Sequence, residues 1–152
     1  MRICLVSSSF YPATFYGGPV SATFGLSKIL AKRGIEMCIS TTNANGKSRL
    51  DIQTNRFIPK GNNFSVKYYH EQFINKFSIA FIFGIWGDIK RADVVYIQYL
   101  FHYTVFFSLL FSLLQNKDII ICPRGSFSSF TLSNRLPFIK SVWLKLLIKP
   151  FC

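Results

Sequence analysis

Short runs of branched apolar residues alternate along the chain with longer stretches of helical pattern. The first such run covers residues 2–7, and a helical stretch from about residue 20 to residue 32 follows it after a loop. This alternation predicts βαβ units, in which parallel strands are covered by helices on both faces. We therefore expect an α/β fold, with a Rossmann-like parallel sheet and helices on both of its faces.

Turn residues set the limits of the expected elements. Gly34 ends the first helix, as glycine commonly does, and Pro59 and Gly61 interrupt the apolar pattern between residues 56 and 69. A polar loop begins at residue 43 and runs to about residue 55. The expected strands are 2–7, 35–41, one or two strands within 56–69, 93–98 and 118–122, and the expected helices are 20–32, 71–91, 101–114 and 135–149.

The balance of charges favours anionic partners. The chain of 152 residues fits one domain, and it carries 18 Lys and Arg against 6 Asp and Glu, a formal net charge of +12. Such a charge suits nucleic acid, phosphorylated small molecules or an acidic membrane surface. The aromatic residues lie in apolar runs rather than beside exposed cations, and no nucleic-acid-binding module is recognisable. We therefore expect no nucleic-acid partner.

Cysteine usage and the lengths of the apolar runs bear on the compartment. The four cysteines stand far apart without a CxxC pair or a histidine at ligand spacing, so we expect free thiols in a reducing cytosol and no metal site. The apolar start is too short for a secretory signal. The runs 77–86 and 100–114 are shorter than the roughly 20 residues that a membrane span needs. These patterns predict a soluble, cytoplasmic chain.

The loop after the first expected strand contains two adjacent glycines, Gly17 and Gly18, directly before a helix. Their backbone N–H groups and the positive end of the helix suit an anionic ligand. The spacing matches neither GxGxxG nor a Walker loop, so a flexible turn explains the glycines equally well. In a sheet of this kind, ligands bind beyond the carboxyl ends of the strands, where this loop lies.

Three other candidate residues lie at or just after the ends of expected strands. Arg124 follows the strand at 118–122, where its guanidinium is suited to a phosphate or carboxylate; a surface arginine in a turn is the alternative. Gln98 ends the strand at 93–98, and His102 opens the next helix. His102 has the chemistry of a general base, although a packed or capping histidine is the more common situation.

The expected helix at 135–149 is basic and amphipathic. Its cations, its tryptophan and its apolar side suit an anionic membrane surface, and they suit equally an apolar side that covers the sheet with solvated lysines outside. The residues assigned to membrane contact are Lys140, Trp143, Lys145 and Lys149. We therefore expect a location in the cytoplasm, with peripheral contact to the cytoplasmic face of the membrane.

Several motifs together resemble the amino-terminal domain of family 4 glycosyltransferases. They are MRICLVSSSFYP at 1–12, the glycine pair at 17–18, LAKRG at 30–34, TTNANG at 41–46, ADVVYI at 92–97 and CPRGS at 122–126. Each motif is loose by itself, but their order along nearly the whole chain is more specific. The resemblance implies one half of a GT-B architecture, in which two Rossmann-like domains face each other.

The resemblance also implies an activity: retaining transfer of a sugar from a nucleotide-activated donor, in the synthesis of cell-surface polysaccharide or glycolipid. No cofactor or bound metal is implied. The donor diphosphate would lie at Gly17 and Gly18. The acceptor and cleft positions implied are Asn45, Tyr96, Arg124, Gly125 and Ser126. Family members commonly carry histidines where this chain has Tyr96 and Gln98, so the catalytic residues stay unknown and Gln98 and His102 are weak candidates.

The donor-binding domain of the family is absent from residues 1–152. We therefore expect the acceptor-side domain alone, with poor donor binding and negligible turnover, because the missing half would stabilise the leaving diphosphate. A separately encoded donor domain is one partner that would complete the enzyme. The alternative function is a non-catalytic Rossmann-like domain that binds a membrane surface or a protein partner.

Overall fold

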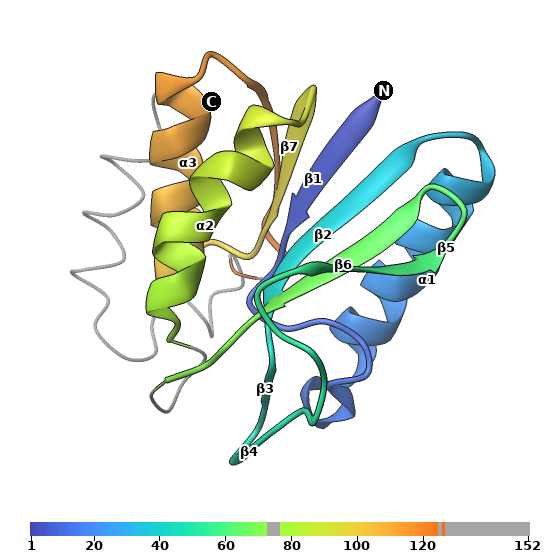
Figure 1. The fold of residues 1–152 in the computed structure, drawn as a ribbon, viewed down its shortest axis with the longest axis vertical. Helices are drawn as coiled ribbons and strands as arrows, with labels where there is room; N and C mark the ends of the chain where they lie inside the picture. Colours follow the sequence, from blue (N-terminus) through green and yellow to red (C-terminus); the bar gives the residue numbers. More distant parts are fainter. Residues whose placement is uncertain (73–76, 125, 127–152) are drawn as a thin grey trace.

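A six-stranded, mostly parallel sheet organises the computed structural model, which describes residues 1–72, 77–124 and 126 (Figure 1). The elements in chain order are β1 (Arg2–Val6), the 3-10 turn η1 (Thr14–Tyr16), α1 (Gly18–Lys32), β2 (Glu36–Thr42), β3 (Ala44–Asn45), β4 (Ser48–Arg49), β5 (Phe57–Gly61), β6 (Phe64–Tyr69), α2 (Ile79–Lys90), β7 (Val94–Gln98), α3 (Tyr103–Leu114) and β8 (Asp118–Cys122).

The strand order of the sheet is β5-β6-β2-β1-β7-β8. Strand β1 lies near the centre and pairs in parallel with β2 on one side and with β7 on the other. Strands β6 and β8 extend the parallel sheet, and only β5 is antiparallel to its neighbour. Strands β3 and β4 form a separate small hairpin. The expected α/β, Rossmann-like class is confirmed.

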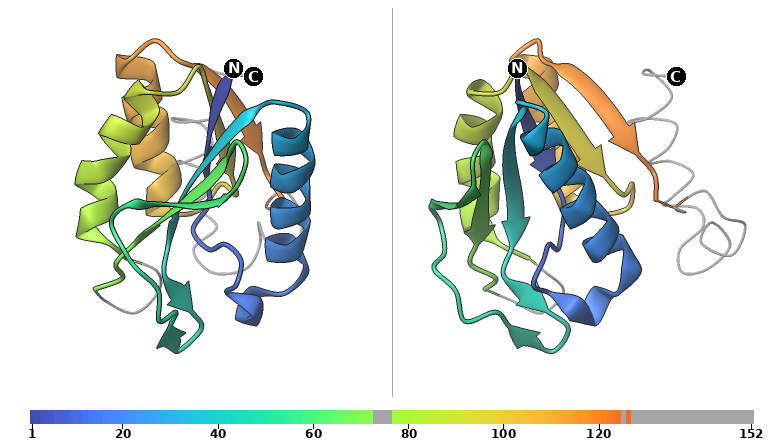
Figure 2. Two further views of the ribbon diagram at one scale, coloured as in Figure 1. Left: turned by 45° about the vertical axis from the view of Figure 1, so that its right-hand side comes forward. Right: turned by 90° about the vertical axis from the view of Figure 1, so that its right-hand side faces the viewer.

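The helices cover both faces of the sheet, as the alternating pattern predicts (Figure 2). Helix α1 packs on one face over a core that includes Leu5, Ile39 and Val66. Helices α2 and α3 pack on the other face over a second core that includes Val6 and Ile97. Successive residues of β1 and β7 thus enter opposite cores, which explains why these strands are apolar throughout rather than alternating.

The helix expected from residue 71 begins later than predicted. Ser78 is its N-cap, and the Ser78 hydroxyl accepts a hydrogen bond from the backbone N–H of Phe81 at 3.1 Å. The backbone N–H of Glu71 instead donates to the Asn43 side chain at 2.8 Å, so Glu71 belongs to the connection from β6. The helix expected at 135–149 lies outside the described residues.

A buried carboxylate, Asp88 of α2, joins that helix to the sheet. Its side chain is fully buried and accepts hydrogen bonds from Lys67 Nζ at 3.0 Å and from the Ser40 hydroxyl at 2.8 Å. The Tyr69 hydroxyl also donates to it, and Arg91 lies 3.4 Å away at the surface. One acidic group therefore ties together α2, β2 and β6.

Candidate functional site

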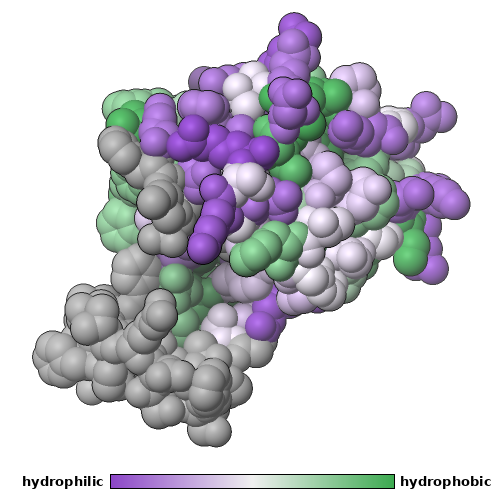
Figure 3. Space-filling view, turned by 90° about the horizontal axis from the view of Figure 1, so that it is seen from below, coloured by the Kyte–Doolittle hydropathy of each residue, from purple (hydrophilic) through white to green (hydrophobic). Residues whose placement is uncertain are grey.

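The sheet has a topological switch point between β1 and β7. From β1 the chain adds β2, β6 and β5 on one side of the sheet, and it then adds β7 and β8 on the other side. The chain leaves β1 toward α1 on one face of the sheet, and it leaves β7 toward α3 on the opposite face. The two loops therefore separate at the carboxyl edge, and such a switch point is where open α/β sheets bind ligands. Hydrophilic and weakly hydrophobic residues make up most of the described surface at this edge, which Figure 3 shows from below.

The glycine pair forms the entrance to α1 at this edge. Gly17 is the N-cap residue with a φ of 69°, a conformation that favours glycine. Gly18 is the first residue of the helix, and a Cβ added there would meet nothing within 4 Å. The fold itself therefore does not require glycine at Gly18. No side chain caps this helix and no acid lies in its first turn, so the positive end of α1 stays available to an anion.

Arg124 and Gln98 meet at the second turn of α1 through a residue that sequence reasoning missed, Thr23. The Thr23 hydroxyl accepts a hydrogen bond from Arg124 Nη2 at 3.2 Å. Its own proton faces two acceptors, Gln98 Oε1 at 2.9 Å and the carbonyl of Pro19 at 2.7 Å. The structure thus brings the strand-end residues of β7 and β8 beside the helix that the glycine pair opens.

Two donors in this cluster lack acceptors among the described residues. They are Gln98 Nε2 and Arg124 Nε, both buried and without a hydrogen-bond partner. Buried polar atoms are nearly always hydrogen-bonded, so each exception needs an explanation. Both atoms are donors, so the group that would satisfy them is an acceptor such as a phosphate, carboxylate or sugar oxygen.

Two tyrosines next to Arg124 are neutral. Burial raises the pKa of Tyr96, and it also raises the pKa of Tyr99, although the positive charge of Arg124 opposes both shifts. Within the described part of the chain, Arg124 belongs to no ion pair. Its charge is therefore not neutralised by a described carboxylate, and it remains available to an anionic ligand.

His102 is the N-cap of α3. Its Nδ1 accepts from the backbone N–H of Thr104 at 3.4 Å and lies 3.0 Å from the Thr104 hydroxyl. The ring also packs against Tyr103, with centroids 4.7 Å apart. The structure thus places His102 in the capping position that we weighed against a catalytic role, and no described contact joins it to Gln98 or Arg124.

Asn45 lies in the β3–β4 hairpin and supports the glycine entrance. Its side-chain oxygen accepts a hydrogen bond from the backbone N–H of Phe15 at 3.2 Å. The Tyr16 hydroxyl in turn accepts from the N–H of Gly46 at 3.0 Å, and a Cβ on Gly46 would meet the Phe15 ring at 2.6 Å. Asn45 therefore positions the turn that leads to Gly17, a role that the sequence did not reveal.

Of the remaining expected site residues, the structure describes only Ser126. Ser126 is buried, and its N–H donates to the carbonyl of Pro123 at 2.9 Å, so it belongs to the same turn as Arg124. Gly125 and the proposed membrane-contact residues Lys140, Trp143, Lys145 and Lys149 lie outside the described residues.

Other features of the described residues bear on ligands and location. Cys4, Cys38 and Cys122 are free thiols. In this part of the chain, no three His, Cys, Asp or Glu residues lie close enough together to hold a metal ion. Among the described residues, no helix is both long enough and apolar enough to cross a bilayer.

The sequence matches no protein-family model, and a search of curated proteins finds no significant match. Function is therefore inferred from the geometry of the switch point and from the motif resemblance.

Proposed function

We propose that this chain is the acceptor-side domain of a retaining, nucleotide-sugar-dependent glycosyltransferase of family 4. The reaction would serve cell-surface polysaccharide or glycolipid synthesis. The observation that carries the proposal is the cluster at the switch point: an uncapped helix start at Gly17 and Gly18, joined through Thr23 to Arg124 and Gln98. The ordered motifs supply the choice of family.

The cluster suits an oxygen-rich anion for three physical reasons. The first turn of α1 offers the positive end of a 15-residue helix and the backbone N–H of Gly18, whereas Pro19 has no N–H and the N–H of Val20 donates to the carbonyl of Gly17 at 3.2 Å. Arg124 adds a charge without a described counter-ion, and Gln98 Nε2 adds a donor without a described acceptor. A donor diphosphate at the glycines would therefore be stabilised by charge and by hydrogen bonds, while Arg124 and Ser126 would face the acceptor.

The proposal implies a second domain that provides the nucleoside pocket and stabilises the leaving diphosphate. The domain described here would then bind the donor weakly by itself, with a Kd of about 1 mM or higher. Weak binding of this kind is measurable by NMR, because each glycine amide reports on its own surroundings.

The binding experiment titrates uniformly ¹⁵N-labelled full chain with UDP and with GDP. We expect the amide signals of Gly17 and Gly18 to shift, and we expect Arg124→Gln to weaken this response. Arg56→Gln is the matched control, because Arg56 is exposed and precedes β5. Unchanged Gly17 and Gly18 signals at about 10 mM ligand would contradict the proposed donor site.

The activity experiment combines the full chain with a candidate donor domain, encoded downstream or separately. Transfer from a nucleotide sugar is expected with the wild-type chain and is expected to fall with Arg124→Gln. A folded combination that binds nucleoside diphosphate and transfers no sugar to any acceptor offered would count against the enzyme function.

A second candidate function is binding to an anionic membrane surface, and the outward face of α2 and α3 favours it. Large apolar side chains lie exposed at helical spacing, with Phe83 79% exposed and Leu114 65% exposed. The full exposed set is Ile79, Phe83, Trp86, Leu110, Leu113 and Leu114. The two helices pack together, with the rings of Trp86 and Phe111 5.2 Å apart.

Charge complementarity supports an anionic bilayer as the occupant of this face. The exposed cations Lys90 and Arg91 and the half-buried Lys117 lie at one end of the helix pair. The only acid within α2 and α3, Asp88, is buried. Apolar side chains beside cations are the pattern of proteins that lie on anionic lipid, and the exposed acids nearest these cations, Asp93 and Asp118, lie outside the two helices.

Flotation with vesicles tests this second function. We expect binding to vesicles rich in phosphatidylglycerol at low salt, and loss of binding on Phe83→Gln with Leu114→Gln. Phe15→Gln is the control, because Phe15 is also 69% exposed but lies in η1. No flotation at low salt would refute the membrane function, and self-association of the wild type that Phe83→Gln abolishes would assign the face to a second copy instead.

A further inference from the structure

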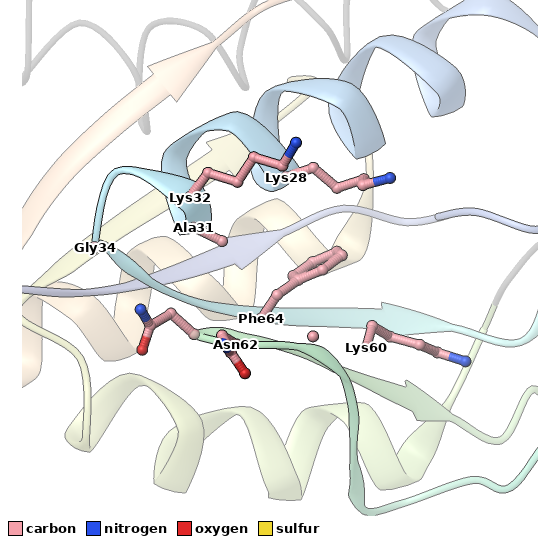
Figure 4. A pocket seen from close by; sticks show the side chains of 9 residues that line it. Lys28, Ala31, Lys32, Gly34, Lys60, Asn62 and Phe64 are labelled. Atoms are coloured by element: carbon pink, nitrogen blue, oxygen red, sulfur yellow. The ribbon is translucent and has the colours of Figure 1, made fainter.

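A hollow of about 450 Å³ lies at the amino-terminal edge of the sheet, opposite the switch-point site. The end of α1, the turn at Gly34 and the hairpin between β5 and β6 form its walls. Figure 4 shows Lys28 and Lys60 on either side of the Phe64 ring, one from α1 and the other from β5. The volume is within the range of small-molecule sites.

The polar side chains that line the hollow are positively charged or neutral, and each can donate hydrogen bonds. Lys28, Lys32 and Lys60 contribute ammonium groups, and Asn62 and Asn63 contribute amides. No acid is among the lining residues. The three lysines take part in none of the ion pairs found among the described residues.

Two of these lysines, Lys28 and Lys32, carry like charges on one face of α1. They are one helical turn apart, a spacing at which like charges destabilise a helix, and α1 contains no acid that would compensate. The negative end of the helix favours a cation at Lys32, but this effect does not explain Lys28. An anion in the hollow would offset the unfavourable pairing of Lys28 with Lys32.

The carbonyl groups at the end of α1 do not need the lysines either. The N–H of Gly34 donates to the carbonyl of Ala31 at 3.0 Å, and the N–H of Ile35 donates to that of Leu30 at 3.2 Å. This pair of bonds is the Schellman arrangement, which satisfies the last carbonyls of a helix from the backbone.

The end of α2 differs in this respect. There the ammonium group of Lys117 donates to the carbonyls of Lys90 and Ala92, at 3.1 and 2.6 Å. A lysine is thus used to cap α2, whereas backbone N–H groups close α1. The lysines of the hollow are therefore not needed to cap α1. Among the contacts of the described residues, Lys28 Nζ lies over the Phe24 ring at 5.3 Å from its centroid, a contact that leaves its N–H donors able to meet a ligand.

The floor of the hollow is apolar. Ala31 and Phe64 are 6% and 5% exposed, and Phe64 packs edge-on against Phe10 with centroids 6.3 Å apart. A ligand would therefore meet ammonium groups around the rim and an apolar surface beneath. This combination suits a small organic molecule that carries more than one phosphate.

We propose that the hollow between Lys28, Lys32 and Lys60 binds a small organic phosphate, with its phosphates on the lysines and its carbon skeleton over Ala31 and Phe64. A free phosphorylated solute and a phosphorylated lipid headgroup share this chemistry. The site is separate from the switch point, so it does not depend on the proposed transferase function.

The test is an NMR titration that uses Gly34 and Gly61, which line the hollow, as reporters. One arm adds fructose 1,6-bisphosphate, and the other adds short-chain phosphatidylinositol 4-phosphate, which carries two phosphates, below its micellar concentration. We expect saturable shifts at Gly34 and Gly61 in at least one arm, and the tighter arm identifies the source of the ligand. The affinity should fall as salt rises, because the lysines are exposed.

The decisive comparison uses two triple variants with the same change in net charge. Lys28→Gln/Lys32→Gln/Lys60→Gln removes the ammonium groups of the hollow and should weaken binding by about tenfold. The control, Lys47→Gln/Arg49→Gln/Arg56→Gln, removes three exposed cations elsewhere and should leave the affinity within about threefold.

Equal losses in the two triple variants would show binding by net charge alone and would overturn the proposal. So would an absence of shifts at Gly34 and Gly61 in both arms. Shifts at Gly17 and Gly18 report on the switch point, so failure at one site is distinguishable from failure at the other.

Discussion

Asp88→Asn should destabilise the fold strongly, although the two side chains have nearly the same shape. The Asp88 side chain is fully buried, and Lys67, its closest cationic partner, is 11% exposed. The amide of asparagine keeps hydrogen-bonding capacity toward Ser40 and Tyr69 but carries no charge. The variant therefore leaves the Lys67 ammonium group largely buried without a counter-ion.

The size of the effect follows from this loss of pairing. Removing one partner of a buried ion pair costs about 3–5 kcal/mol. The contact with Arg91 adds little, because the Arg91 side chain is 59% exposed. With the amide retaining some hydrogen bonds, we expect the free energy of unfolding to fall by about 3 kcal/mol. For a chain of this length, that change lowers Tm by about 6–12 °C.

Urea denaturation, followed by circular dichroism, measures this change, and a double-mutant cycle identifies its cause. Lys67→Met removes the cation, so adding it to Asp88→Asn should recover part of the lost stability. Asp118→Asn is the control, because Asp118 is exposed on β8, and it should change stability by no more than about 0.5 kcal/mol. A loss below about 1 kcal/mol in Asp88→Asn, or additive effects in the cycle, would refute the reasoning.

Two further predictions concern packing and thiol chemistry. Gly87→Ala should stabilise α2 by up to about 1 kcal/mol, because an added Cβ meets nothing within 4 Å. Gly84→Ala should instead cost about 1–2 kcal/mol, because its Cβ would lie 2.5 Å from the Tyr69 ring; urea denaturation showing the reverse order would contradict this packing. Burial raises the pKa of Cys4, so little thiolate forms even at pH 9, and a thiol reagent should label Cys4 only as fast as the protein unfolds. Cys122 is half-buried and should react sooner; equal rates in single-cysteine variants would rule out a closed core around Cys4.

Local sequence patterns predicted most of the described strands and helices. Strands β1, β7 and β8 were predicted to within about one residue at each end, because each is a continuous apolar run that ends at polar or turn-forming residues. Gly34 marked the end of α1, where it adopts a φ of 84°. These elements depend on residues close to them in the chain.

The features that sequence reasoning missed depend on distant contacts. Glu71 is excluded from α2 because its N–H donates to Asn43, 28 residues earlier, and the helix begins after the Ser78 cap instead. The site was predicted in part, since Gln98 and Arg124 lie at strand ends, where parallel sheets gather functional residues. Thr23 could not be identified, because its partner Arg124 is 101 residues away and lies in a left-handed turn with a φ of 49°.

The central position of β1 has a consequence for the order in which the nascent chain can fold. When the ribosome has made residues up to Tyr69, β1 can pair with β2, but its other edge has no partner until β7 is made. At about 5–20 residues per second, the intervening synthesis takes about 1.5–6 s. During this interval the open edge of β1 and the apolar residues destined for α2 are exposed to solvent. Chaperones that recognise such surfaces would therefore act on this protein before residue 98 is translated.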